Sequence, residues 1–255
     1  MYELSANLEW LFAERDDLGA RVRAAAALGV PAVEIWGWRG RDVGGLELAL
    51  RETGVVLQTM CVDPMGTLVD PATHEVFVDA VGESAALADR LGCPYLVITA
   101  GDERGGVSRE EQRRAVVDAL RRAAGVLDGY RAVLLLENLN SRVDHVGTFL
   151  DSTAECLDIV DEVGSPKVKV LYDHYHSLVM GERPEVVLAG RVDRVGHVQT
   201  ADVPGRHEPG TGKVDWAHEL RVLRDLGYAG RIGLECVPTV STAEALAHIR
   251  EHDPQ

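Results

Sequence analysis

Short apolar segments recur along the chain, and a helical pattern follows most of them. We count eight such segments rich in Val, Ile and Leu, and several are apolar almost without interruption. Strands that are covered on both faces have this pattern, because neither face has to be polar. The predicted strands are residues 4–8, 32–37, 55–62, 95–101, 132–139, 168–173, 195–201 and 231–237.

Helix start and stop signals lie between these segments. Residues 17–29 begin with an acidic cap and end at a glycine, which is typical of a helix with defined ends. Ser108 and Glu111 have the spacing of a capping box, in which each side chain hydrogen-bonds the backbone of the other residue. The tetrapeptide STAE repeats that spacing at 152–155 and at 241–244. Predicted strands and predicted helices therefore alternate along the chain.

A strand followed by a helix, about eight times in 255 residues, is typical of a (β/α)8 barrel, or TIM barrel. The competing fold is an open doubly wound sheet, but the glycine-rich phosphate-binding pattern of that fold is missing after the first strand. No linker or low-complexity stretch divides the sequence. We therefore predict a single barrel domain over residues 1–255.

Charge and composition limit the partners of this chain. Its 26 basic and 41 acidic side chains give a net charge of −15, and a surface this negative repels phosphate backbones, so nucleic acid is not an expected partner. The sequence shows neither a membrane-spanning apolar run nor a signal-peptide pattern, which predicts a cytoplasmic protein without a membrane partner. The four cysteines are widely separated, which favours small buried side chains over a structural zinc site.

Polar side chains end the last four predicted strands. Glu137, Asp173, Gln199 and Glu235 lie at the C-terminal ends of these strands, where the catalytic groups of a barrel gather. Neighbouring strands lie about 4.8 Å apart, so the four side chains can converge on one point. Each carboxylate could instead cap a helix, but four consecutive strands ending this way are hard to explain by capping alone. Glu34 ends the second strand similarly, but the tryptophans beside it suggest packing, and we leave it out.

Three carboxylates in one partly buried site would repel one another and take up protons unless a cation lay among them. Oxygen ligands favour Mg²⁺ or Mn²⁺ over zinc. On the seventh strand, His197 and Gln199 point to the same face, and Gln199 lies nearer the open end. We therefore predict Gln199 as a ligand and His197 as part of a supporting layer. The predicted metal ligands are Glu137, Asp173, Gln199 and Glu235.

Three further residues are candidates for substrate binding. His176 follows Asp173 by three residues, which would place it above the metal. The loop at 200–216 contains prolines and glycines that fix its backbone, and it presents Arg206 and His207 at the open end of the barrel. A guanidinium in a rigid loop is suited to binding a carboxylate or a polyol. The alternative is a structured turn whose charges are solvated.

Several stretches of the sequence resemble the hydroxypyruvate isomerase family, which belongs to the xylose isomerase-like barrels together with the ketose 3-epimerases. The resemblance covers most of the chain and is strongest from Glu137 onward. It departs from the family pattern in the loops after the third and fourth strands, where residues 100–106 alone echo it. The stretches that carry the resemblance are residues 5–14, 137–140, 172–176, 197–212 and 227–236.

The resemblance implies a xylose isomerase-like fold and a divalent metal as cofactor, Mg²⁺ or Mn²⁺. It places the metal ligands on Glu137, Asp173, Gln199 and Glu235. The acid–base pair falls on Glu137 and Glu235, and His176 matches a position that contacts substrate in related epimerases, as does Arg206. No other cofactor-binding residue is implied. Barrels of this kind often form homo-oligomers, and the sequence leaves the oligomeric state open.

The predicted activity is isomerisation of a small keto acid or ketose through an enediolate, with Glu137 and Glu235 transferring the proton. Two outcomes use the same site, a ketose 3-epimerase and a lyase acting on an oxidised sugar conjugate. A nuclease resembling the AP endonucleases is disfavoured by the acidic surface. A binding protein without turnover is disfavoured because all four predicted ligands are present.

Overall fold

The structure is a computed structural model that describes residues 1–253. Eight parallel strands form a closed barrel in which each strand pairs with the next and the last pairs with the first. All eight predicted strands are confirmed, and most are shorter than their apolar segments. The strands are β1 (Leu4–Asn7), β2 (Ala32–Ile35), β3 (Val56–Cys61), β4 (Tyr95–Ile98), β5 (Val133–Glu137), β6 (Val168–Asp173), β7 (Val195–Thr200) and β8 (Ile232–Leu234).

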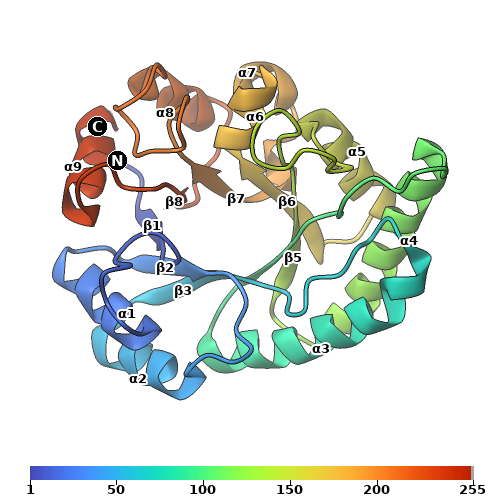
Figure 1. The fold of residues 1–255 in the computed structure, drawn as a ribbon, viewed down its shortest axis with the longest axis horizontal. Coiled ribbons are helices and arrows are strands. Elements are labelled where there is room, and N and C mark those ends of the chain that lie inside the picture. Colours follow the sequence, from blue (N-terminus) through green and yellow to red (C-terminus); the bar gives the residue numbers. More distant parts are fainter. Residues whose placement is uncertain (254–255) are drawn as a thin grey trace.

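Helices surround the barrel, and Figure 1 shows the strands in the centre with the helices outside them. The helices are α1 (Leu18–Ala27), α2 (Val43–Thr53), α3 (His74–Leu91), α4 (Arg109–Leu127), α5 (Thr153–Val163), α6 (His174–Met180), α7 (Pro184–Val187), α8 (Trp216–Asp225) and α9 (Thr242–His252). Short 3-10 turns lie at Pro71–Thr73 and Val192–Arg194. The predicted alternation of strands and helices in a (β/α)8 barrel is therefore confirmed.

Side-chain caps fix the starts of several helices where the sequence predicted them. Ser108 and Glu111 form the complete capping box at the start of α4. Ser152 and Ser241 each accept a hydrogen bond from the backbone N–H three residues later, at the starts of α5 and α9. These bonds satisfy N–H groups that have no partner inside the helix. They therefore fix the residue at which each loop that follows a strand ends and the next helix begins.

The barrel has two apolar layers. The larger core lies between the strands and the helices, and a smaller cluster fills the barrel interior with one residue from each of β3 to β6. Strands that are apolar on both faces are explained by this arrangement. The interior cluster consists of Cys61, Val97, Leu135 and Leu171.

The two ends of the described chain meet. The backbone N–H of Tyr2 donates a hydrogen bond to the carboxylate of Asp253, which follows α9, and Figure 1 shows α9 beside the N-terminus. Within residues 1–253, no helix combines the length and the apolar character that crossing a membrane requires. All four cysteines are buried and free.

Candidate functional site

The four polar residues predicted at the strand ends lie together at the C-terminal end of the barrel. Glu137 and Asp173 are the last residues of β5 and β6. Gln199 lies one residue before the end of β7, and Glu235 directly follows β8. The strand register places Asp173 beside Gln199, and all four side chains are buried. This end of the barrel is therefore rich in buried oxygen atoms.

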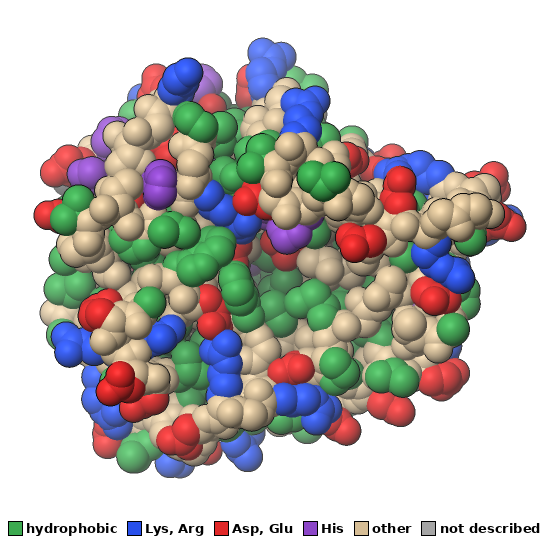
Figure 2. All heavy atoms as spheres, viewed as in Figure 1, with side chains coloured by type: hydrophobic (Ala, Val, Ile, Leu, Met, Phe, Trp, Pro, Cys, Tyr) green, Lys and Arg blue, Asp and Glu red, His purple; other side chains and the backbone are tan. Residues whose placement is uncertain are grey.

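A cavity of about 530 Å³ opens at the same end, and its lining joins apolar side chains to charged groups from the strand ends and the loops that follow them. In Figure 2, hydrophobic side chains gather around a central hollow bordered by basic and acidic side chains. The lining includes Trp10, Trp36, Glu137, His145, His176, Arg206 and Glu235. A small polar molecule could therefore contact both glutamates.

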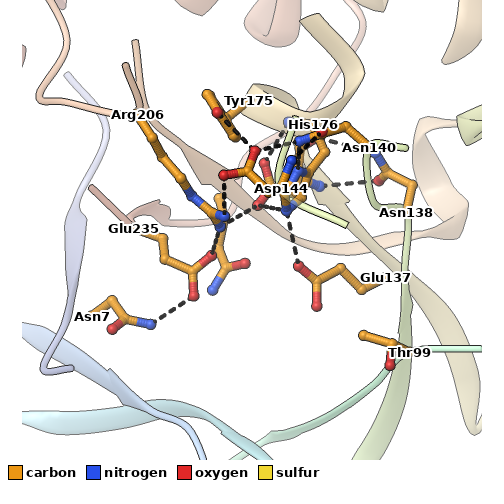
Figure 3. Close-up of polar contacts among 12 residues, drawn as sticks. Asn7, Thr99, Glu137, Asn138, Asn140, Asp144, Tyr175, His176, Arg206 and Glu235 are labelled. Atoms are coloured by element: carbon orange, nitrogen blue, oxygen red, sulfur yellow. Dashed lines mark hydrogen bonds and ion pairs between the residues drawn. The ribbon is translucent and has the colours of Figure 1, made fainter. Parts of the chain in front are cut away.

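Glu235 is held by donors from three distant parts of the chain. Its Oε1 accepts hydrogen bonds from Asn7 Nδ2 at 2.9 Å and from Trp36 Nε1 at 2.8 Å. Its Oε2 accepts a hydrogen bond from Arg206 Nη2 at 2.8 Å. Figure 3 shows Arg206 and Asn7 reaching this carboxylate. The side chain is therefore fixed in the cavity wall by groups from β1, from the residue after β2 and from the loop after β7.

Arg206 lies between two aromatic rings. Its guanidinium carbon is 4.8 Å from the ring centroid of Trp10 and 4.9 Å from that of Tyr175. Its Nη2 also lies 3.8 Å from Asp173 Oδ2. The residue has a φ of 57°, a left-handed conformation that side-chain-bearing residues seldom adopt. Stacking and ion pairing hold the planar guanidinium at the cavity, as suits a group that binds anions or hydroxyls.

Both carboxylate oxygens of Asp173 lie close to His176 at the end of β6. Its Oδ1 accepts a hydrogen bond from the backbone N–H of His176 at 3.0 Å, which caps α6. Its Oδ2 lies 3.5 Å from His176 Nε2. Possible ligand atoms of Glu137, Asp173 and His176 all lie within 4.8 Å of one another. Helix capping and a place in the site are thus compatible, and His176 is a candidate ligand that the sequence had assigned to substrate binding.

Gln199 is oriented by Glu34, a residue that sequence reasoning left out of the site. Gln199 Nε2 donates a hydrogen bond to Glu34 Oε2 at 2.7 Å, and His197 Nε2 lies 2.7 Å from Glu34 Oε1. Burial raises the pKa of Glu34, but His197 and the hydrogen bonds it receives outweigh burial and lower the pKa overall. An ionised carboxylate only accepts, so the amide NH₂ of Gln199 faces Glu34. The Oε1 of Gln199 is buried and has no hydrogen-bond partner within residues 1–253.

A glycine on β8 makes room for this network. Gly233 pairs with Gln199 in the sheet, and a Cβ at this position would lie 2.3 Å from Glu34 Oε1 and 2.9 Å from His197 Nε2. Any other residue at this position would displace the side chains of Glu34 and His197, and Glu34 is the residue that orients Gln199. The sequence signal for Glu34 was its place at the end of an apolar segment, the same signal that identified the four candidates on β5 to β8.

The carboxyl groups of the site are crowded. Burial raises the pKa of Glu137 well above its usual range, and the nearby Glu235 and Asp173 raise it further. Burial also raises the pKa of Glu235 to about 7, although Arg206 opposes this rise. Burial lowers the pKa of His176 to about 4, so its ring is neutral at pH 7. Proton uptake by the two glutamates is the response expected of carboxylates gathered without enough positive charge.

The predicted substrate-binding residues are placed differently. His176 and Arg206 line the cavity. His207 Nδ1 lies 2.8 Å from the carbonyl oxygen of Val237, so this ring connects the loop after β7 with the loop after β8. A role for His207 in substrate binding stays a prediction.

Comparisons with known proteins agree along nearly the whole chain. A family model described as a xylose isomerase-like TIM barrel matches residues 22–252. A putative hydroxypyruvate isomerase of Homo sapiens is 34% identical over 260 residues, which are 97% of this chain and 94% of the human protein. The hydroxypyruvate isomerase of Escherichia coli K12 is 32% identical over 253 residues, which are 96% and 97% of the two chains.

A solved structure is similar over its full length. It is a crystal structure described as AP endonuclease, family 2, from Brucella melitensis, with a TM-score of 0.91 and 27% sequence identity. The match covers 100% of each chain. The barrel and its connections are therefore shared with that protein from one end to the other.

Proposed function

The chain belongs to the xylose isomerase-like TIM barrel family and, within it, to the hydroxypyruvate isomerase family. We propose that it is a divalent-metal-dependent isomerase of a small hydroxy-keto acid or sugar. The observation that carries the proposal is the pair Glu137 and Glu235. Both are buried, both line one cavity, and burial raises the pKa of each. Carboxyl groups whose pKa is raised inside a cavity are suited to taking up and releasing a proton in a reaction.

The donor set fits a divalent cation. Gln199 Oε1 is a buried acceptor without a partner in the described chain, and a cation near it would also relieve the crowding of the carboxylates. We propose that Glu137, Asp173, Gln199 and Glu235 hold the ion, and oxygen donors of this kind favour Mg²⁺ or Mn²⁺. When bound, the ion would act as a Lewis acid toward the carbonyl oxygen of the substrate.

The two glutamates account for the proton transfer. In Figure 3 the carboxyl groups of Glu137 and Glu235 point into the same space from opposite sides. One takes the proton from the carbon that bears the hydroxyl group next to the carbonyl, which gives an enediolate. The other returns a proton to the former carbonyl carbon, and a hydroxyl proton moves between the two oxygens. The net change is isomerisation without gain or loss of atoms.

Substrate identity is tested by a screen of the protein loaded with Mg²⁺ or Mn²⁺. Hydroxypyruvate, other short keto acids and ketoses are incubated in D₂O and followed by NMR. We expect deuterium to enter at the carbon beside the carbonyl of one substrate class, with conversion to the isomer. Inversion at C3 of a ketose would favour the epimerase alternative, and bond cleavage the lyase. Absence of both exchange and conversion for every compound would contradict the proposal.

Replacing Arg206 with Ala should separate keto acids from neutral ketoses. If Arg206 binds a substrate carboxylate, the KM for a keto acid should rise by about 10²-fold, because a charge-assisted bidentate contact is lost. Arg206→Lys keeps the charge but loses the planar fork, so it should recover only part of the affinity. Steady-state kinetics on both classes give the result. Unchanged KM for the keto acid in both variants would remove Arg206 from carboxylate binding.

Replacing Glu34 with Gln should lower the affinity for Mn²⁺ by about 10–100-fold, the usual effect of losing a residue that orients a metal ligand. A neutral amide at position 34 can donate as well as accept, so the amide of Gln199 would no longer be held with its oxygen free. Equilibrium dialysis with Mn²⁺ measures the change. Glu52→Gln removes an exposed carboxylate paired with Arg23 and should leave the affinity unaltered. Equal affinity in Glu34→Gln and the wild type would contradict the orienting role.

A nuclease is the alternative from another class, and the name of the Brucella melitensis structure is the observation in its favour. The net charge of −15 opposes it, because a DNA backbone would be repelled. Cleavage of a duplex with an abasic site by the purified protein would revive this alternative. We further propose that the protein works in the cytoplasm on a small-molecule substrate.

A further inference from the structure

The orientation of the Asn140 side chain is fixed by its own loop. Asn140 is buried after β5, and its Oδ1 accepts hydrogen bonds from the backbone N–H groups of Val143 at 2.9 Å and Asp144 at 3.0 Å. The opposite orientation would set the amide NH₂ against two N–H donors. The hydrogen-bond network therefore assigns the oxygen and the nitrogen of this amide.

Both hydrogens of this amide are then committed. Nδ2 donates to Asp144 Oδ2 at 2.7 Å and lies 2.6 Å from His176 Nδ1. Tyr175 also donates its hydroxyl hydrogen to Asp144 Oδ2 at 2.8 Å, which holds that carboxylate in place. An amide nitrogen has no lone pair to offer, so His176 Nδ1 has to be the acceptor. In the neutral ring the proton consequently resides on Nε2.

The protonated nitrogen faces the site. His176 Nε2 is buried without a hydrogen-bond partner in residues 1–253, 3.5 Å from Asp173 Oδ2 and 4.0 Å from Glu137 Oε1. Figure 3 shows the ring between Asn140 and Glu137. A nitrogen that carries a proton cannot bind a cation, and a ring held in this form cannot act as a base through Nε2. What remains is an N–H donor beside the cavity.

We propose that Asn140 is a positioning residue that holds His176 in its Nε2–H form, so that His176 donates a hydrogen bond to a carbonyl or enediolate oxygen of the substrate. This role rests on the proposed isomerase function. It also distinguishes the two candidate sets of metal ligands. A protonated Nε2 excludes the set that contains His176, which favours the set in which Gln199 and Glu235 join Glu137 and Asp173. A preorganised donor aimed at a developing oxyanion is worth about 10²–10³-fold in turnover.

The protonation pattern is measured by long-range ¹H–¹⁵N NMR on metal-free protein with ¹⁵N-labelled histidine, and His176→Gln identifies the signals. In the wild type we expect Nε2 to be protonated and Nδ1 unprotonated. In Asn140→Asp the ionised carboxylate can only accept, so an oxygen lone pair faces Nδ1 and Nδ1 should become protonated. The new side chain still accepts from the two backbone N–H groups. Val143→Asp adds a charge at an exposed position on the same loop and should leave the pattern unchanged.

Kinetics then test the consequence. Asn140→Asp should lower kcat by about 10²-fold with a smaller change in KM, whereas Val143→Asp should behave like the wild type. A wild-type spectrum with Nδ1 protonated overturns the inference even if the variant fails to fold. A wild-type spectrum as expected, with no turnover of any keto acid or ketose, leaves the tautomer standing and rejects the proposed function. Unchanged kcat in a variant whose tautomer has switched removes the donor role.

Discussion

Glu235→Gln is expected to lower kcat by about 10³-fold or more, and Glu137→Gln should do the same. Each change removes a group that takes up or releases a proton in the reaction, a contribution usually worth about 10²–10⁴-fold. The replacement has nearly the same shape, and its oxygen can still accept the hydrogen bonds that Asn7 and Trp36 give to Glu235, whereas the hydrogen bond from Arg206 is lost. The variants should therefore still fold, and the decrease in kcat should come from the proton-transfer step.

Deuterium exchange distinguishes the two roles. A variant that lacks the base should neither exchange the substrate proton nor form product, whereas a variant that lacks only the acid should still exchange without isomerising. Glu52→Gln is the control, because Glu52 is an exposed carboxylate that pairs with Arg23. Its kcat should stay within about threefold of the wild type. Near-normal turnover in either test variant would remove that glutamate from the mechanism.

The barrel was predictable because its signals are local. Each strand is a short apolar segment, and each helix start that was predicted from a Ser cap is formed by that residue. The C-terminal ends of the strands were predicted less accurately. The last predicted segment ran to residue 237, whereas β8 ends at Leu234, because the side chains after it serve the cavity and its backbone leaves the sheet.

The contacts across the barrel were not predictable from local pattern. Glu34 and Gln199 are 165 positions apart, and only closure of the sheet brings β2 opposite β7. The register also shifts between Val33 and Glu34, which no periodicity reveals. The sequence could therefore identify Gln199 as a site residue but not the carboxylate that orients it. Asn140 was hidden for the same reason, since its partner His176 lies on the next strand–helix unit.

In the metal-free protein, replacing Glu235 with Gln is expected to remove a loss of stability that the wild type undergoes as the pH rises. Burial, and to a smaller extent Asp173, raises the pKa of Glu235 from 4.5 to about 7, with Arg206 acting in the opposite direction. A raised pKa means that the folded state prefers the neutral carboxyl. The stability that this provides is complete below pH 4.5 and is lost as the pH rises through about 7. Above that range the ionised side chain costs about 3 kcal/mol.

The amide introduced by Glu235→Gln stays neutral at every pH, although its NH₂ replaces the oxygen that accepts from Arg206 Nη2. Relative to the wild type, the variant should therefore gain stability between pH 4.5 and pH 8. The Tm of the variant relative to the wild type should rise by roughly 6–12 °C between the two pH values for a chain of this size. Calorimetry in EDTA at both pH values gives the comparison, with Glu52→Gln as the control. A Tm difference that is the same at both pH values would contradict the assigned cause.

Adding Mn²⁺ should stabilise the wild type more than Glu235→Gln. A ligand that binds the folded state alone raises its stability, and the wild type retains all four proposed oxygen ligands, whereas the variant has lost a charged one. The wild type should therefore gain more Tm from Mn²⁺ than Glu235→Gln does. If the two gain equally, Glu235 is not a ligand. A carboxylate cluster that costs the metal-free fold stability at neutral pH and is stabilised by the bound ion would be kept for function rather than for stability.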